Sequence, residues 1–232
     1  MLVIPAIDLE GGRSRVVYWP GAAAGIGTPT DRPDRIAERF VEQGARILHL
    51  VDFDGARRGS PGNLEAVGQI AARVAVPVQV AGGLEGADQI RLAFAAGATR
   101  VVLAMSVVEQ PAVLADCLAA AGDWLAVGLD PRPERFAAYP WRRETPTLSD
   151  VIGELVGLGV GRFVLTHGGG EADASRVAGL VRSFDAEFLV AGGVRDVATL
   201  GRLRDAGVAG VILGEALLSG AIDFPAAAEA AA

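Results

Sequence analysis

Residues 80–84 read VAGGL, and residues 190–194 repeat this pattern as VAGGV. The match continues into the next apolar run at the same spacing, because VVLA at 101–104 corresponds to VILG at 211–214. A short apolar run that ends in paired glycines is typical of a buried strand followed by a tight turn into a helix. The repeat therefore predicts a chain built from two similar halves of alternating strands and helices.

Similar apolar runs recur along the rest of the chain, and segments of helical period, such as 33–44 and 63–74, separate them. The eight predicted strands are residues 2–7, 47–51, 77–81, 101–104, 125–129, 163–166, 188–191 and 211–213. Eight strand–helix units in this order predict an α/β fold, a single (βα)8 TIM barrel domain over residues 1–232. The half-repeats span about 1–122 and 123–232.

Composition and charge exclude several classes of function. A net charge of −7 argues against a nucleic-acid partner, which is bound through an excess of Lys and Arg. The apolar run at 2–7 is short and ends at Asp8, so we expect a strand and not a signal peptide, and no run approaches a membrane span. We therefore expect a cytoplasmic protein without a membrane partner. The single cysteine, Cys117, is expected to be a small buried hydrophobic residue.

Polar residues directly after predicted strands mark the expected active-site face of the barrel. Asp8 and Asp130 follow equivalent strands of the two halves, which lie opposite one another in an eight-stranded barrel. Two opposed carboxylates can divide proton-transfer roles, although either could instead cap the following loop. Thr166 follows the sixth strand. Asp52 is expected to order the loop at 52–63 together with Asp54 and Gly55.

Six segments resemble the ProFAR isomerase family of histidine biosynthesis. They are IPAIDLEGG at 4–12, LHLVDFDGA at 48–56, VAGGL at 80–84, VGLD at 127–130, AGGV at 191–194 and GVILGEAL at 210–217. That family converts an N-linked aminoaldose phosphate to the aminoketose by an Amadori rearrangement. The resemblance covers nearly the whole chain and implies an aldose–ketose isomerase with a small phosphorylated sugar substrate.

The resemblance also implies roles for individual residues. Asp8 corresponds to the general base, Thr166 keeps the family's threonine, and Glu171 falls at the position of the general acid. His167 replaces a family acid, and we expect either a functional substitute or a loop residue hydrogen-bonded to backbone.

The phosphate contacts that the resemblance implies differ between the halves. Gly192, Gly193 and Gly214 match the family pattern, and their backbone N–H groups could bind a phosphate. Gly82 and Gly83 are also kept, but Glu85 replaces an arginine and Ala104 and Met105 replace Gly-Thr. An acid beside a phosphate is unfavourable, so we expect one phosphate site to be altered.

Two further residues resemble substrate contacts of the family. Arg15 resembles a basic residue that binds the substrate. Trp141 resembles a tryptophan that stacks on the base, or it is an exposed hydrophobic residue of a long loop. The two histidines, His49 and His167, lack metal-ligand spacing, so no metal or organic cofactor is expected. The resemblance implies a monomer. Two alternatives stay open: a related barrel that isomerises another phosphorylated aldose, including phosphoribosyl anthranilate, and a barrel that binds a phosphorylated metabolite without converting it.

Overall fold

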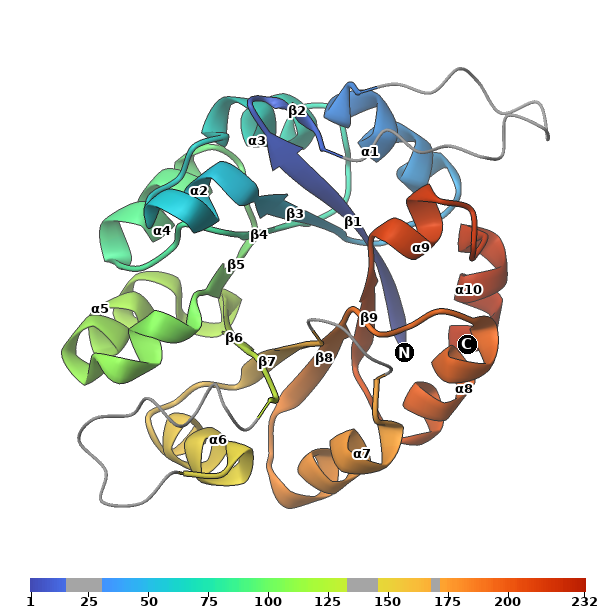
Figure 1. The fold of residues 1–232 in the computed structure, drawn as a ribbon. Helices are drawn as coiled ribbons and strands as arrows, with labels where there is room; N and C mark the ends of the chain where they lie inside the picture. The colour runs from blue at the N-terminus through green and yellow to red at the C-terminus, as the bar shows by residue number, and fades with distance from the viewer. Residues whose placement is uncertain (16–30, 133–145, 168–171) are drawn as a thin grey trace.

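A closed ring of eight parallel strands forms the centre of the molecule, and helices surround it (Figure 1). The computed structural model describes residues 1–15, 31–132, 146–167 and 172–232. The strands are β1 (Leu2–Glu10), β3 (Leu48–Asp52), β4 (Val78–Ala81), β5 (Arg100–Leu103), β6 (Leu125–Leu129), β7 (Arg162–Thr166), β8 (Glu187–Ala191) and β9 (Gly210–Leu213). They pair in this order and β9 pairs back with β1, Val211 beside Val3, which confirms the predicted (βα)8 barrel.

The first strand is longer than the sequence predicted. It continues to Glu10 and pairs antiparallel with β2 (Arg13–Ser14), a hairpin strand that the sequence analysis missed. Gly11 and Gly12 form the two-residue turn, and both have left-handed backbone angles, with φ of 58° and 77°. Such angles are what a two-residue hairpin turn requires.

Ten α-helices are assigned within the described ranges: α1 (Pro33–Glu42), α2 (Phe53–Arg58), α3 (Leu64–Ala71), α4 (Ala87–Ala95), α5 (Pro111–Ala121), α6 (Leu148–Gly157), α7 (Ala174–Ser183), α8 (Val197–Asp205), α9 (Glu215–Leu218) and α10 (Phe224–Ala231). Their starts follow ordinary rules. Proline begins α1 and α5, and Asp173 caps α7 by accepting hydrogen bonds from backbone N–H groups. The alanine-rich end of the chain is ordered within α10, where Ala227 and Ala231 are buried.

Two apolar layers hold the barrel together. The larger layer lies between strands and helices, where Cys117 is buried as expected. The smaller layer fills the barrel interior and includes Ile4, Ala6, Ala126 and Val164. Because alternate residues of a strand face the same side, Asp8 and Thr166 are the next inward positions after Ala6 and Val164, and Asp130 lies four residues beyond Ala126.

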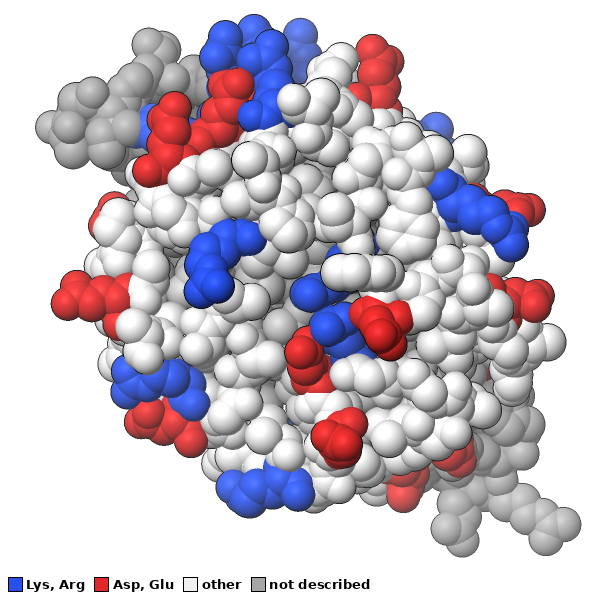
Figure 2. Space-filling model, turned by 180° about the vertical axis from the view of Figure 1, so that it is seen from behind, with Lys and Arg blue, Asp and Glu red and all other residues white. Residues whose placement is uncertain are grey.

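Polar side chains form part of the barrel interior near the amino ends of the strands. His49 is buried in β3, and its Nδ1 lies 2.8 Å from Gln79 Nε2, while Arg100 Nη1 donates to Gln79 Oε1 at 3.3 Å. Burial lowers the pKa of His49 to about 4, so this imidazole is neutral at pH 7. The back of the molecule shows basic and acidic side chains together near its centre (Figure 2). Within the part of the chain that the structure describes, no helix is long and apolar enough to cross a membrane.

Candidate active site

Asp8 faces the interior at the carboxyl end of β1, two and four residues beyond the inward-facing Ala6 and Ile4. Its side chain is partly buried, and no residue of the described ranges donates a hydrogen bond to its carboxylate. Burial raises the pKa of Asp8, the positive charge of Arg15 lowers it, and the negative charge of Glu215 raises it. A carboxylate in these surroundings is suited to accept a proton from a ligand.

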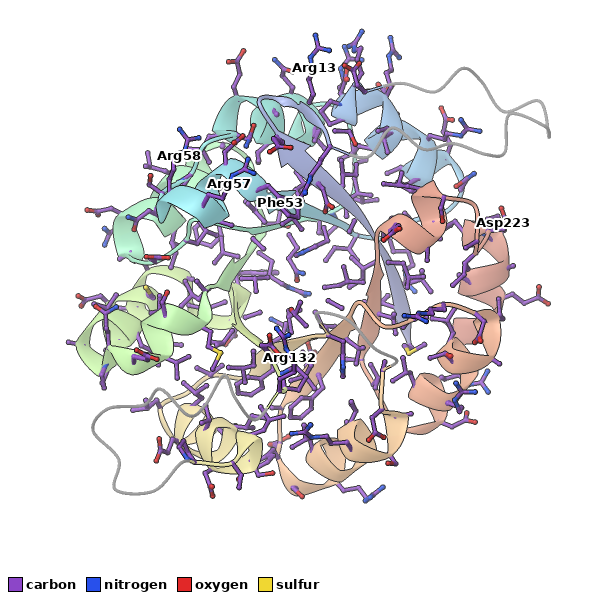
Figure 3. The ribbon with its side chains drawn as sticks, in the orientation of Figure 1. Arg13, Phe53, Arg57, Arg58, Arg132 and Asp223 are labelled. Atoms are coloured by element: carbon purple, nitrogen blue, oxygen red, sulfur yellow. The ribbon has the colours of Figure 1, made fainter. Side chains whose placement is uncertain are left out.

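Asp130 directly follows β6, which lies four strands from β1 in either direction around the ring. The two acids therefore end opposite strands, as the sequence predicted. Arg132 binds the Asp130 carboxylate through its Nε, at 2.9 Å and 3.0 Å from the two oxygens. Figure 3 shows Arg132 on the side of the ring where β6, β7 and β8 lie. Asp130 is thus engaged by a guanidinium, whereas Asp8 is not.

Thr166 ends β7 beside the end of β8, paired with Ala191, and its side chain is exposed. The next residue, His167, continues this pairing, since its backbone N–H donates to the Ala191 carbonyl at 2.7 Å. The proposed acid, Glu171, lies outside the described residues, as does Trp141.

A pocket of about 570 Å³ opens at the ends of β8 and β9. Its lining includes the three glycines predicted for this half, Gly192, Gly193 and Gly214, together with charged or polar side chains. The latter are His167, Arg195, Glu215 and Ser219. Gly192 and Gly193 have φ of 74° and 71°, a conformation that exposes backbone N–H groups at a turn. This pocket could hold a phosphate group of a ligand.

The equivalent glycines of the first half are closely packed. Gly83 is buried, and a Cβ added to it would stand 2.7 Å from the Ser60 carbonyl carbon, while one added to Gly82 would overlap the backbone carbonyl of Asp52. The carboxylate of Glu85 lies over Gly59, with Oε2 3.1 Å from an added Cβ. Packing against the end of β3 and the segment that follows it thus accounts for glycine at both positions.

The segment after β3 corrects one prediction. Residues 52–63 were expected to form a loop, but Phe53–Arg58 form α2, which Asp52 caps through Gly55 N–H at 2.7 Å. Asp52 also accepts hydrogen bonds from Asn63 N and Nδ2, and Asp54 accepts one from Gly11 N–H. The hydrogen bond from Gly11, together with those from the side chains of Asn63 and Arg57, keeps the pKa of Asp54 well below its usual range. Asp52 therefore orders this segment, as predicted.

The backbone of Arg15 lies next to that of Asp8, and the Arg15 N–H donates a hydrogen bond to the Asp8 carbonyl at 2.8 Å. Its guanidinium carbon lies 4.4 Å from the centre of the Phe53 ring, and its Nε is 3.7 Å from Glu10. Figure 3 shows Phe53 at the inner side of α2, with Arg57 and Arg58 farther out. Arg15 is therefore held at the barrel mouth by a cation–π contact.

Three charged residues of this region were not predicted. Arg132 follows Asp130 by two residues. This spacing permits the hydrogen bonds between the guanidinium and the carboxylate but does not require them. Arg195 and Glu215 directly follow the predicted phosphate segments, and this proximity was the available signal. Among the four described ranges, no three His, Cys, Asp or Glu residues gather as a candidate metal site.

Comparisons with known proteins give one consistent result. Residues 2–223 match the model of a family described as histidine biosynthesis protein. Three similar proteins are each named 1-(5-phosphoribosyl)-5-((5-phosphoribosylamino)methylideneamino) imidazole-4-carboxamide isomerase. The protein of Roseiflexus castenholzii is 37% identical over 95% of this chain and 95% of its own length. That of Chloroflexus aggregans is 34% identical over 98% and 96%, and that of Gloeobacter violaceus is 35% identical over 100% and 94%.

Proposed function

The chain belongs to the histidine biosynthesis protein family, and from this membership we propose that it is an aldose–ketose isomerase acting on ProFAR, the imidazole carboxamide substrate for which its relatives are named. The observation that carries this proposal is similarity over almost the entire chain to isomerases of one reaction. The reaction is an isomerisation, so no atom or electron is gained or lost overall.

The proposed chemistry is an Amadori rearrangement. Opening of the sugar ring forms a protonated imine at C1, which acidifies the hydrogen on C2. Asp8 removes that proton and leaves an enaminol; protonation at C1 and loss of the hydroxyl proton at C2 then give the ketose. The partly buried, unengaged carboxylate of Asp8 supports this role, because a base works best when its pKa is raised toward the working pH.

The acid partners are assigned from their places in the chain and at the barrel mouth. Glu171 stands at the family's acid position, and we propose that it protonates the ring oxygen. Thr166 faces the same mouth from β7 and could hydrogen-bond the substrate. Asp130, which is bound by Arg132, is proposed to orient the opened sugar.

We propose that the pocket at Gly192, Gly193 and Gly214 binds one phosphate of the substrate. Arg195 lines the same pocket and adds a positive charge. At the other end of the substrate, Gly82 and Gly83 would face a second phosphate, with Glu85 nearby as an unfavourable charge. Arg15 and Trp141 are proposed to contact the substrate between these ends.

One specific observation favours a second candidate. Because the carboxylate of Glu85 lies over Gly59, close in the chain to Gly82 and Gly83, the first half offers a poorer phosphate site. A singly phosphorylated aldose such as phosphoribosyl anthranilate would need the C-terminal pocket alone. It undergoes the same rearrangement on a different amine.

The organisation of the protein in solution remains part of the proposal. We predict a single domain over residues 1–232, a monomer and a cytoplasmic location, with no metal or organic cofactor in the reaction.

The test is a comparison of turnover with both substrates. Purified protein should isomerise ProFAR, followed by its absorbance change, with a kcat/KM well above that for phosphoribosyl anthranilate. The reverse order would favour the singly phosphorylated substrate. No turnover of either by folded protein would mean that the barrel binds a phosphorylated metabolite without converting it.

A further inference from the structure

His167 has a fixed backbone at the edge of the phosphate pocket. Its N–H donates to the Ala191 carbonyl, and its own carbonyl lies against Gly192, where an added Cβ would stand only 2.7 Å away. Residue 192 must therefore be glycine for two reasons, its φ of 74° and this close approach. The end of β8 consequently holds His167 beside the pocket.

The imidazole of His167 is incompletely satisfied. Its Nε2 is buried, and no hydrogen-bond partner is found for it within residues 1–15, 31–132, 146–167 and 172–232. Buried polar atoms usually have a partner, because an unmade hydrogen bond costs stability. His49 differs in this respect, since its ring is hydrogen-bonded to Gln79 in the barrel interior.

Charged residues of both signs surround the His167 ring. Arg176 of α7, Asp173 at the N-cap of that helix and Asp130 after β6 act on it electrostatically. Arg195 and Glu215 line the pocket with it. Burial is the main cause that lowers the pKa of His167, and Arg176 adds to it, while Asp130 and Asp173 act in the opposite direction; the net shift favours the neutral imidazole.

From the unpartnered Nε2 and the place of the ring in the pocket lining, we propose that His167 is a substrate-binding residue that hydrogen-bonds a phosphate monoester in the pocket at Gly192, Gly193 and Gly214. The inference rests on the proposed function only in taking a phosphorylated ligand. Because Nε2 is buried without ligand, the contact requires a half-turn of the ring about its Cβ–Cγ bond, which exchanges Nε2 with Cε1 and Nδ1 with Cδ2.

The proposal implies a specific dependence of binding on pH. A phosphate dianion beside the ring stabilises the imidazolium and forms a charge-assisted hydrogen bond. The pKa of His167 should therefore rise when ligand binds. Above pH ~6.5, where a phosphate monoester is already mostly dianionic, affinity should fall as the pH increases through the raised pKa. A side chain that cannot be protonated should lack this fall.

The experiment uses the two histidines as separate reporters in the NMR spectrum of the whole protein. The C–H resonances of His49 and His167 are assigned from the His167→Asn variant and followed from pH 5 to 8.5, without ligand and with saturating ribose 5-phosphate. Ribose is the control ligand without phosphate. Dissociation constants for wild type and variant are measured over the same pH range, and equal melting temperatures establish that the variant is folded.

We expect ribose 5-phosphate, but not ribose, to move the titration of His167 to higher pH and to leave His49 unchanged. His167→Asn should weaken ribose 5-phosphate binding at pH 6.5 by about tenfold and flatten its pH dependence. Binding that leaves the His167 titration unchanged would overturn the inference, and so would an absence of binding. Neither result depends on turnover. A protein that isomerises ProFAR but shows no change in the His167 titration on ligand binding would keep the proposed function and refute this inference alone.

Discussion

Arg132 binds the Asp130 carboxylate with its Nε 2.9 Å and 3.0 Å from the two carboxylate oxygens. This contact distinguishes the two opposed acids of the barrel, because no described residue donates a hydrogen bond to the carboxylate of Asp8. Similar residues at equivalent places in the two halves thus have different surroundings, and the proposed roles follow this difference.

If Arg132 acts by orienting Asp130, the two residues should behave as one unit. Arg132→Met and Asp130→Asn should each lower kcat/KM by about tenfold, and the double variant should be little worse than either single variant. Steady-state kinetics on the four proteins measures this coupling. Effects that multiply in the double variant would show that the two side chains act independently.

The pH dependence of turnover should report the charges around Asp8. Since the base must be ionised, kcat/KM should rise with pH through the pKa of Asp8, which burial raises. Removing the negative charge in Glu215→Gln should move this acidic limb to lower pH, and removing the positive charge in Arg15→Met should move it to higher pH. The measured quantity is the pH at which kcat/KM is half-maximal. The maximal kcat/KM is not compared, because both residues lie close to the proposed substrate site and can change it directly. If the acidic limb moved in the same direction in both variants, the assignment of Asp8 as the titrating group would be contradicted.

Asp8 should also reduce stability at neutral pH. Its folded-state pKa is raised, so the stability it contributes is present at low pH and is lost as the pH rises through that pKa. Asp8→Asn should therefore melt roughly 2 °C above wild type at pH 7, and the difference should shrink near pH 4. Asp185→Asn, an exposed change before β8, is the control and should leave Tm unchanged. A lower Tm for Asp8→Asn at pH 7 would show that the carboxylate has a stabilising partner.

Gly192 should be far less tolerant of substitution than a helical glycine. Gly192→Ala places a Cβ 2.7 Å from the His167 carbonyl oxygen at a φ of 74°, and should lower the free energy of unfolding by about 1–3 kcal/mol. Gly179→Ala is the matched control, because an added Cβ in α7 has no neighbour within 4 Å, and it should raise stability by up to ~1 kcal/mol. Denaturant unfolding measures both. Equal effects would mean that the close approach at Gly192 relaxes without cost.

The strands were predictable because each is a short apolar run between polar or glycine-rich segments. The strand at Leu125–Leu129 has the predicted limits, and β4 and β8 differ from prediction by one residue at one end. Helix α2 was missed because it has only six residues, includes a glycine and depends on capping by Asp52. A short helix of this kind is fixed by tertiary contacts and not by propensity.

The candidate site was predictable in position but only partly in detail. Strand order placed Asp8 and Asp130 opposite one another, and this requires only the closed ring. The repeated AGG segments gave no indication that Gly83 is buried against Gly55 and Ser60. That packing arises from a neighbouring segment that the repeat does not contain.

The most direct test of the account is the turnover of ProFAR by wild type and Asp8→Asn, with binding measured separately. The account predicts that Asp8→Asn lowers kcat by about a thousandfold while the dissociation constant of ProFAR changes little, because a base acts on the transition state more than on binding. An Asp8→Asn variant that turns ProFAR over at the wild-type rate would contradict it and would remove Asp8 as the base.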